Sequence, residues 1–280
     1  MRKMFKRKKE KKTAENPAPI VPAAPIDSCP VGIGNAHHIG ARETQQDNFG
    51  ISDISNKDLR GRKGVFGIVA DGMGGMADGG EVSALVTRTM LQYFNETESS
   101  GQPELDLLNM LFAANDNVNR FMEGREQGGS TVVSVILKGD SLYWVAVGDS
   151  RICLSRSGSL IQINREHTYA AELDEKAAMG EISWEEAAGH PSRGALTSYL
   201  GMGALDQIDR SERPVRLLAG DCILLMSDGV FGVLSDDEIL EAIRAEPNQR
   251  ASAMQDKILA KQNPHQDNFT AVILEYKGVQ

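Results

Sequence analysis

The chain has 280 residues, of which 41% are hydrophobic and 25% are charged, and its formal net charge is −9. These values are ordinary for a soluble globular protein, and no apolar run approaches the ~20 residues that a membrane-spanning helix needs. Its three cysteines, Cys29, Cys153 and Cys222, are widely spaced and include no Cys-x-x-Cys pair. They therefore support neither a disulfide framework nor a thiolate zinc site, and a reducing, cytoplasmic setting fits them best.

The first part of the chain differs in composition from the rest. Eight Lys and Arg stand against two Glu between Arg2 and Glu15, and four prolines follow before Ile26. Proline at this density is incompatible with a helix and with the apolar region of a signal peptide. We expect residues 1–28 to form a disordered basic and Pro/Ala-rich tail, ahead of one domain at residues 29–280. Such a tail fits a solvated, solubilising segment or weak contact with an anionic membrane, and nothing in the sequence requires nucleic acid.

From Val31 onward, apolar runs typical of strands alternate with amphipathic stretches of helical period. In chain order we expect strands at Phe49–Ser52 and Val65–Ala70, helices at Gly80–Phe94 and Leu105–Met122, strands at Thr131–Leu137, Leu142–Val147 and Cys222–Met226, a helix at Asp236–Ala245 and a strand at Phe269–Leu274.

The links between these elements indicate how the sheets are built. Several strands are apolar at nearly every position, which predicts sheets covered on both faces. Only four residues separate Leu137 from Leu142, too few for a parallel crossover, so these two strands form a hairpin. The pattern Ser235-x-x-Glu238 is a capping box that opens the last helix. Together these features predict the α+β class, as a four-layer αββα sandwich of two mainly antiparallel sheets flanked by helices.

Five aspartates stand at the expected strand ends. Asp71, Asp149 and Asp228 follow strands, whereas Asp47 and Asp267 directly precede them. The end of one antiparallel strand and the start of its neighbour share an edge, so all five could gather at one rim. Any one of them alone would be explained as a turn residue or a cap. Five in the same relation to strands are better explained by a shared function.

Clustered carboxylates repel one another and raise each other's pKa unless a cation offsets their charge. Only Arg42 and Arg151 lie close to them in the sequence. A divalent ion with oxygen ligands, Mn²⁺ or Mg²⁺, is the natural counterion. Gly72 has no side chain, so its carbonyl could approach such an ion beside Asp71. The glycines after Asp71 match neither a P-loop nor a dinucleotide-binding pattern.

These residues lie in six short motifs that, in this order, resemble the bacterial PP2C-type (PPM) metal-dependent serine/threonine protein phosphatases. The resemblance covers roughly residues 30–277 and implies the same αββα fold. The motifs are Arg42–Asp47, Asp71–Gly75, Gly129–Thr131, Gly148–Arg151, Ser227–Gly229 and Asp267–Thr270.

The resemblance implies a metal site with two core ions and a third, weaker one. Asp71, Asp228 and Asp267, with the Gly72 carbonyl, would hold the two core Mn²⁺ or Mg²⁺ ions. Asp149, together with Asp228, would hold the third.

The resemblance also implies the reaction, in which a water or hydroxide bridging two metals attacks phosphoserine or phosphothreonine in line. Asp47 would act near the metals through a bound water. Arg42 would bind the substrate phosphate, because its planar guanidinium donates two hydrogen bonds to phosphate oxygens. Partners would be phosphorylated proteins, the substrates of a Ser/Thr kinase, and the chain would act as a monomer.

The chain departs from the family pattern at two positions. Gln46 stands where the family often has Glu, which removes a charge from the water shell. Met73 stands where eukaryotic members have a histidine proposed as general acid, so leaving-group protonation must come from elsewhere. The segment His167–Gly203 resembles the flap beside the family's active site, although a surface helix pair explains its composition equally well.

Two other functions remain open from the sequence. One is a noncatalytic binding module that kept the fold, against which the intact carboxylates and Arg42 argue. The other is a hydrolase of small phosphoesters or nucleotides that uses the same metals. The histidines show no metal-ligand spacing, and we expect structural or surface roles for them.

Overall fold

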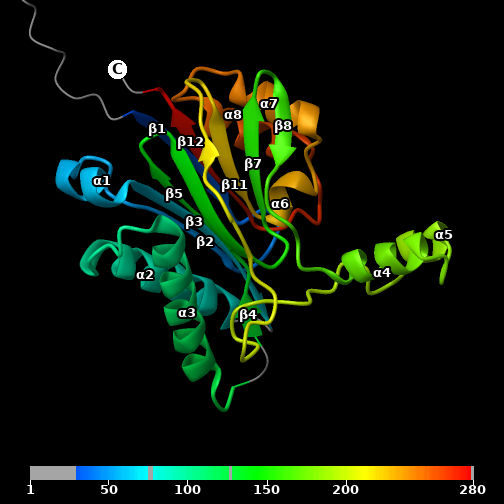
Figure 1. Ribbon diagram of the computed structural model, residues 1–280. Coiled ribbons are helices and arrows are strands. Elements are labelled where there is room, and N and C mark those ends of the chain that lie inside the picture. Colours follow the sequence, from blue (N-terminus) through cyan, green and yellow to red (C-terminus); the bar gives the residue numbers. More distant parts are fainter. Residues whose placement is uncertain (1–29, 75–77, 126–127, 279–280) are drawn as a thin grey trace, which may run out of the picture.

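The computed structural model describes residues 30–74, 78–125 and 128–278. The expected tail at residues 1–28 lies outside the described residues. Two sheets stack face to face, and helices cover the outer face of each (Figure 1). Every strand pair is antiparallel, which confirms the predicted α+β sandwich.

The first sheet has five strands in the order β1-β12-β11-β7-β8, so the last strand of the chain lies beside the first. These strands are β1 (Val31–His38), β12 (Phe269–Tyr276), β11 (Cys222–Met226), β7 (Arg151–Arg156) and β8 (Ser159–Gln162).

The second sheet has the order β10-β6-β5-β3-β2, with β4 paired to β3 and β9 paired to β6. Its strands are β2 (Asp47–Ile51), β3 (Val65–Gly74), β4 (Gly128–Ser130), β5 (Val132–Lys138), β6 (Ser141–Val147), β9 (Asp209–Arg210) and β10 (Val215–Arg216).

Helices α2 and α3 cover the second sheet, and α7 and α8 cover the first. No helix in the described ranges combines the length and apolar character that crossing a bilayer requires. The helices are α1 (Lys57–Lys63), α2 (Asp78–Glu96), α3 (Pro103–Met122), α4 (Tyr169–Ala178), α5 (Trp184–Ala188), α6 (Asp228–Phe231), α7 (Asp236–Ile243) and α8 (Arg250–Ala260).

The layers follow from the alternation of side chains along the central strands. In β3, Phe66 and Ile68 face α2 and α3, whereas Val65 and Val69 face the other sheet. Both faces of the strand are therefore buried, which explains why its sequence is apolar without interruption. The predicted hairpin is confirmed as β5–β6, where Lys138 pairs with Ser141.

The end of β3 needs correction, whereas the predicted capping box is confirmed. Strand β3 continues past Ala70 to Gly74, because residues 72–74 pair with β4, so Asp71 lies inside a strand rather than at its end. The capping box predicted at Ser235 is present, and a second one, between Ser183 and Glu186, opens α5. The sequence contains the same Ser-x-x-Glu pattern at Ser183, which is the signal that predicts this helix start.

Helices α4 and α5 project from the sandwich as a separate pair (Figure 1). Two backbone hydrogen bonds close its base, from Tyr169 to the Ala195 carbonyl and from Thr197 to the His167 carbonyl. Its small core contains Leu173, Ala177 and Ala187. The segment compared above to a flap is thus a helix pair on the surface.

The end of α2 depends on a buried lysine. The side chain of Lys63 is 6% exposed, and its ammonium donates hydrogen bonds to the carbonyls of Phe94 and Thr97. No basic residue stands in the last turn of α2, so Lys63 supplies the positive charge that a helix C-terminus favours.

We expect Lys63→Met to lower the free energy of unfolding by about 1–3 kcal/mol, because it leaves two carbonyls without their donor. Urea unfolding followed by circular dichroism would measure this loss. The matched control is Arg62→Met, at an exposed position of the same helix, which should change stability by less than about 0.5 kcal/mol. Equal effects of the two substitutions would contradict this role of Lys63.

Candidate active site

The structure brings the five aspartates together at one rim of the sandwich. Asp47 in β2 is the direct cross-strand partner of Asp71 in β3. Asp228 begins α6 at the end of β11, Asp267 directly precedes β12, and Asp149 lies in the turn between β6 and β7. The charges of the other four all act on Asp71. The convergence expected from the strand ends is therefore present.

Asp71 and Asp228 form the centre of this group. Burial, followed by the charges of Asp47, Asp228, Asp149 and Asp267, raises the pKa of Asp71 well above its ordinary 3.8. The pKa of Asp228 is also raised, mainly by burial and secondly by the charge of Asp267.

Asp47 is 2% exposed and is positioned by hydroxyl groups. Ser227 Oγ donates to its Oδ2 at 2.7 Å, whereas its buried Oδ1 accepts no hydrogen bond from the described residues. Burial raises the pKa of Asp47 to about 6, although hydrogen bonds from Ser227 and Thr270 oppose the rise. Ser227 and Thr270 lie in the motifs named above, but the sequence did not reveal this role for them.

Asp149 lies next to the base of the α4–α5 pair. Burial, and next the charge of Asp228, raises its pKa to about 6. The Gly148 N–H donates to Nδ1 of His167 at 3.1 Å, and the His167 N–H donates to the Gly148 carbonyl at 2.8 Å. Burial lowers the pKa of His167, so the ring stays neutral and can accept this bond. His167 is therefore structural, as expected, and it fixes the turn that carries Asp149.

Arg42 contacts the group from its exposed side. Its Nη2 lies 2.5 Å from Oδ2 of Asp267, and the two side chains are 57% and 40% exposed. An ion pair this open to solvent contributes about 0–1 kcal/mol, so Arg42 can exchange partners at little cost. The other nearby arginine, Arg151, donates from its Nε to Oε1 of Glu166 at 2.6 Å.

Close packing also requires a glycine at position 72. A Cβ at this position would lie 2.0 Å from the Gly79 carbonyl oxygen and 2.7 Å from that of Gln46. The missing side chain thus lets the start of α2 and the Gln46 backbone pack directly against β3.

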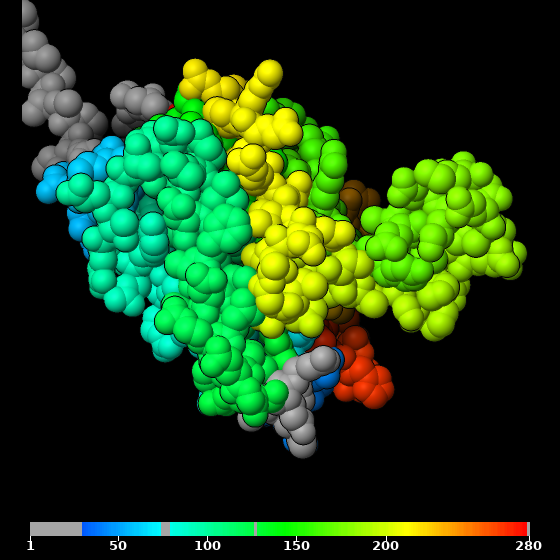
Figure 2. Space-filling view, turned by 60° about the horizontal axis from the view of Figure 1, so that its bottom comes forward, coloured from blue at the N-terminus to red at the C-terminus, as the bar shows by residue number. Residues whose placement is uncertain are grey.

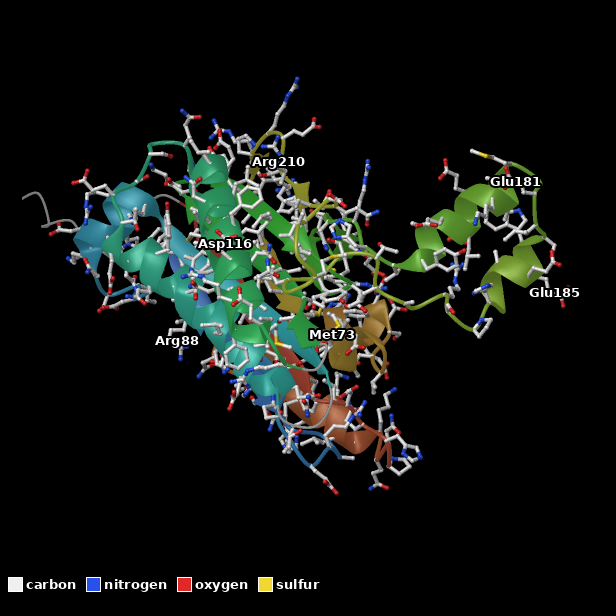
Figure 3. The ribbon with its side chains drawn as sticks, turned by 90° about the horizontal axis from the view of Figure 1, so that it is seen from below. Met73, Arg88, Asp116, Glu181, Glu185 and Arg210 are labelled. Carbon is white, nitrogen blue, oxygen red and sulfur yellow. The ribbon has the colours of Figure 1, made fainter. Side chains whose placement is uncertain are left out.

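The loop that carries Gln46 is held by Asn268, another residue that the sequence did not single out. Asn268 Oδ1 accepts from the Gln46 N–H at 2.7 Å, and its Nδ2 donates to the carbonyls of Ile39 and Thr44. Asn268 follows Asp267, so one turn of chain both supplies a carboxylate and fixes the segment before Asp47. Met73, half-buried opposite Gly129 of β4, is labelled in Figure 3.

The chemistry of the rim suits a hard divalent cation. Its donors are oxygen atoms, and the unpaired buried Oδ1 of Asp47 is an acceptor without a partner. Within the described residues, however, no three Asp, Glu, His or Cys side chains already surround a common point where an ion would lie. Asp267 is paired with Arg42.

Comparison with known proteins fits this arrangement. The sequence pattern of the family Protein phosphatase 2C matches residues 34–263. The chain belongs to this family. Family members of similar sequence include the serine/threonine protein phosphatase PstP of Mycobacterium tuberculosis, which is 34% identical over 213 residues. That match covers 74% of this chain but only 39% of PstP. The serine/threonine phosphatase Stp of Listeria innocua is 28% identical over 247 residues, which cover 85% of this chain and 93% of Stp.

Solved structures of family members share the fold. The serine/threonine phosphatase of S. agalactiae superimposes with a TM-score of 0.72 at 25% identity, covering 88% of this chain and 99% of that one. The catalytic domain of PstP, solved in complex with two manganese ions, gives a TM-score of 0.68 at 26% identity, covering 88% and 97%.

The raised pKa values predict that the metal-free protein loses stability as the pH rises. The pKa values of Asp47 and Asp149 in the folded state are about 6, above the ordinary 3.8. The folded state therefore binds protons more tightly than the unfolded state does. The resulting stabilisation is fully present below about pH 4 and is lost as the pH rises through 6. In EDTA, we expect the free energy of unfolding to fall between pH 4.5 and 7.5 by an amount on the order of 2–3 kcal/mol.

Denaturant unfolding at a series of pH values would measure this fall. Saturating Mn²⁺ should remove most of it, because a cation offsets the same charges. The control is the double variant Asp47→Asn/Asp149→Asn, whose EDTA profile should be flatter. A flat profile for the unmodified protein in EDTA would contradict the electrostatic description of the rim.

Proposed function

We propose that the chain hydrolyses phosphoserine and phosphothreonine in proteins, with Mn²⁺ or Mg²⁺ as cofactor. The observation that carries the proposal is the convergence of Asp71, Asp228, Asp267, Asp47 and Asp149 at one rim. Membership of the protein phosphatase 2C family supports the reaction class. The serine/threonine phosphatases among its relatives support the substrate class.

In this proposal, Asp71, Asp228 and Asp267, with the Gly72 carbonyl, hold two core ions. The complex of the PstP catalytic domain with two manganese ions supports that number. When bound, the ions would supply a bridging water or hydroxide for in-line attack on phosphorus and offset the charge on the phosphoryl oxygens. Asp149, beside Asp228, would hold the third, weaker ion.

The remaining groups bind and orient. Arg42 leaves its exposed pair with Asp267 and donates its two parallel N–H groups to the substrate phosphate. Asp47, held by Ser227, accepts a hydrogen bond from a water of the site through its free Oδ1. Met73 has no proton to donate, so leaving-group protonation falls to another group. The partners are then phosphorylated proteins, the targets of a Ser/Thr kinase, and the chain works as a cytoplasmic monomer.

The direct test is hydrolysis of a phosphothreonine peptide by the full chain with Mn²⁺, with Mg²⁺ and with EDTA. We expect turnover with either ion and none in EDTA, and a higher kcat/KM for the phosphopeptide than for nucleotides. Faster turnover of nucleotides would favour the small-phosphoester hydrolase instead. Metal binding without any turnover would favour the noncatalytic module, and activity that persists after metal removal would refute the mechanism.

A pair of isosteric variants separates the core ions from the third ion. We expect Asp267→Asn to lower kcat/KM by about 10³-fold or more and to weaken the tight Mn²⁺ sites, because a core ligand is lost. Asp149→Asn should keep two tight ions and still reduce turnover. Calorimetric titration with Mn²⁺, together with phosphopeptide kinetics, measures both effects. If Asp149→Asn loses the tight sites while Asp267→Asn keeps them, the carboxylates are assigned to the wrong ions.

A further inference from the structure

The projecting α4–α5 pair has a hollow on its own surface. The hollow has a volume of about 690 Å³ and its apolar lining includes Tyr169, Leu173, Ile182 and Pro191. Its polar lining contains Lys176, Glu185, Glu186 and His190. A hollow of this size falls within the range of binding pockets. None of the rim aspartates lines it, so it is separate from the candidate active site.

The pair is strongly acidic. Between Tyr169 and His190 there are six acidic residues and one lysine. Asp174 pairs with Arg193, and Ser183 donates to Glu186. Four others are exposed and form no ion pair within the described residues: Glu172, Glu175, Glu181 and Glu185. Glu181 and Glu185 lie at the far end of the pair (Figure 3).

The same projection also exposes large apolar side chains. Met179 is 65% exposed and Trp184 is 61% exposed, the two highest values among the large hydrophobic residues of the described chain. The space-filling view shows the pair as a lobe standing apart from the body (Figure 2). Single exposed apolar side chains are common, but two on one small projection that also carries an apolar hollow are the kind of feature that binding surfaces show.

Two cations lie near the hollow, and only Lys176 has no carboxylate partner within the described residues, so the four unpaired glutamates outnumber it. Lys176 donates to the Tyr169 hydroxyl at 3.4 Å and lies over the Tyr169 ring, and Arg193 is held by Asp174. The surface therefore fits a segment that combines several positive charges with a large apolar side chain.

We propose that the segment Met1–Lys12 of this chain docks on the α4–α5 pair. Its sequence places Met4 and Phe5 between basic residues on both sides. Phe5 would enter the apolar hollow while the neighbouring Lys and Arg face the glutamates, so both halves of the surface are matched.

The connecting chain is long enough for this docking. The 17 residues between Lys12 and Pro30 can span up to about 60 Å when extended. Phe5 itself lies 25 residues before Pro30, so its ring can lie up to about 80 Å from Pro30 when the chain is extended. Tethering also gives the segment a high effective concentration at the pair, which favours this occupant over a separate molecule.

Photo-crosslinking in the full chain tests the proposal, with p-benzoylphenylalanine in place of Phe5. We expect the main product to be an intramolecular link from position 5 to α4 or α5, located by mass spectrometry. Glu181→Lys/Glu185→Lys should lower its yield about fivefold or more, because attraction becomes repulsion. Raising NaCl to about 0.5 M should also lower the yield without any substitution.

The matched control is Asp116→Lys/Glu123→Lys, which reverses one exposed acidic residue on α3 and the exposed one directly after it, and should keep the yield within about twofold. Asp116 is labelled in Figure 3. Far-UV circular dichroism checks that both double variants are folded. Equal losses in the two variants, links spread over other surfaces, or links between two copies would each overturn the proposal. The proposal would also be overturned if position 5 formed no link to α4 or α5 and the segment bound phosphatidylserine vesicles instead. None of these outcomes depends on phosphatase activity.

Discussion

The rest of the structure depends on the repulsion among buried carboxylates at one rim of the sandwich. Asp47 and Asp71 face each other across two neighbouring strands, and Asp228 and Asp149 lie close enough to raise the pKa of Asp71 further. Burying unpaired charge is costly, so a carboxylate here must take a proton, a hydrogen-bond donor or a cation. Each of the surrounding features supplies one of these or fixes the backbone that supplies it.

The neutral neighbours of the rim act mainly as positioning groups. Ser227 holds Asp47, Asn268 holds the loop before it, and His167 holds the turn that carries Asp149. None of them carries a full positive charge, so they orient the carboxylates without neutralising them. That arrangement keeps the negative charge available to a cation, and the exposed Arg42 remains free to change partners.

The protein has a second acidic region with the opposite physical character. The glutamates of the α4–α5 pair, such as Glu181 and Glu185, are exposed to water and keep their charge at little cost. Buried carboxylates favour a small, hard ion, whereas exposed ones attract a flexible cationic chain through many weak contacts. The two regions are joined at His167, whose backbone bonds to Gly148 beside Asp149 and whose carbonyl closes the base of the pair.

The sequence by itself determined the sandwich and the gathering of the five aspartates, because both depend on apolar strand runs, short links and positions relative to strand ends. It also determined the β5–β6 hairpin and the Ser235 capping box, which are local patterns. Only the tertiary structure decided that β3 runs through Asp71, because its last residues pair with β4 from far along the chain. In the same way, the need for Gly72 and the role of Asn268 arise from close contacts between distant segments. Such contacts leave no periodic signal in the sequence, since they depend on how the finished layers meet in space.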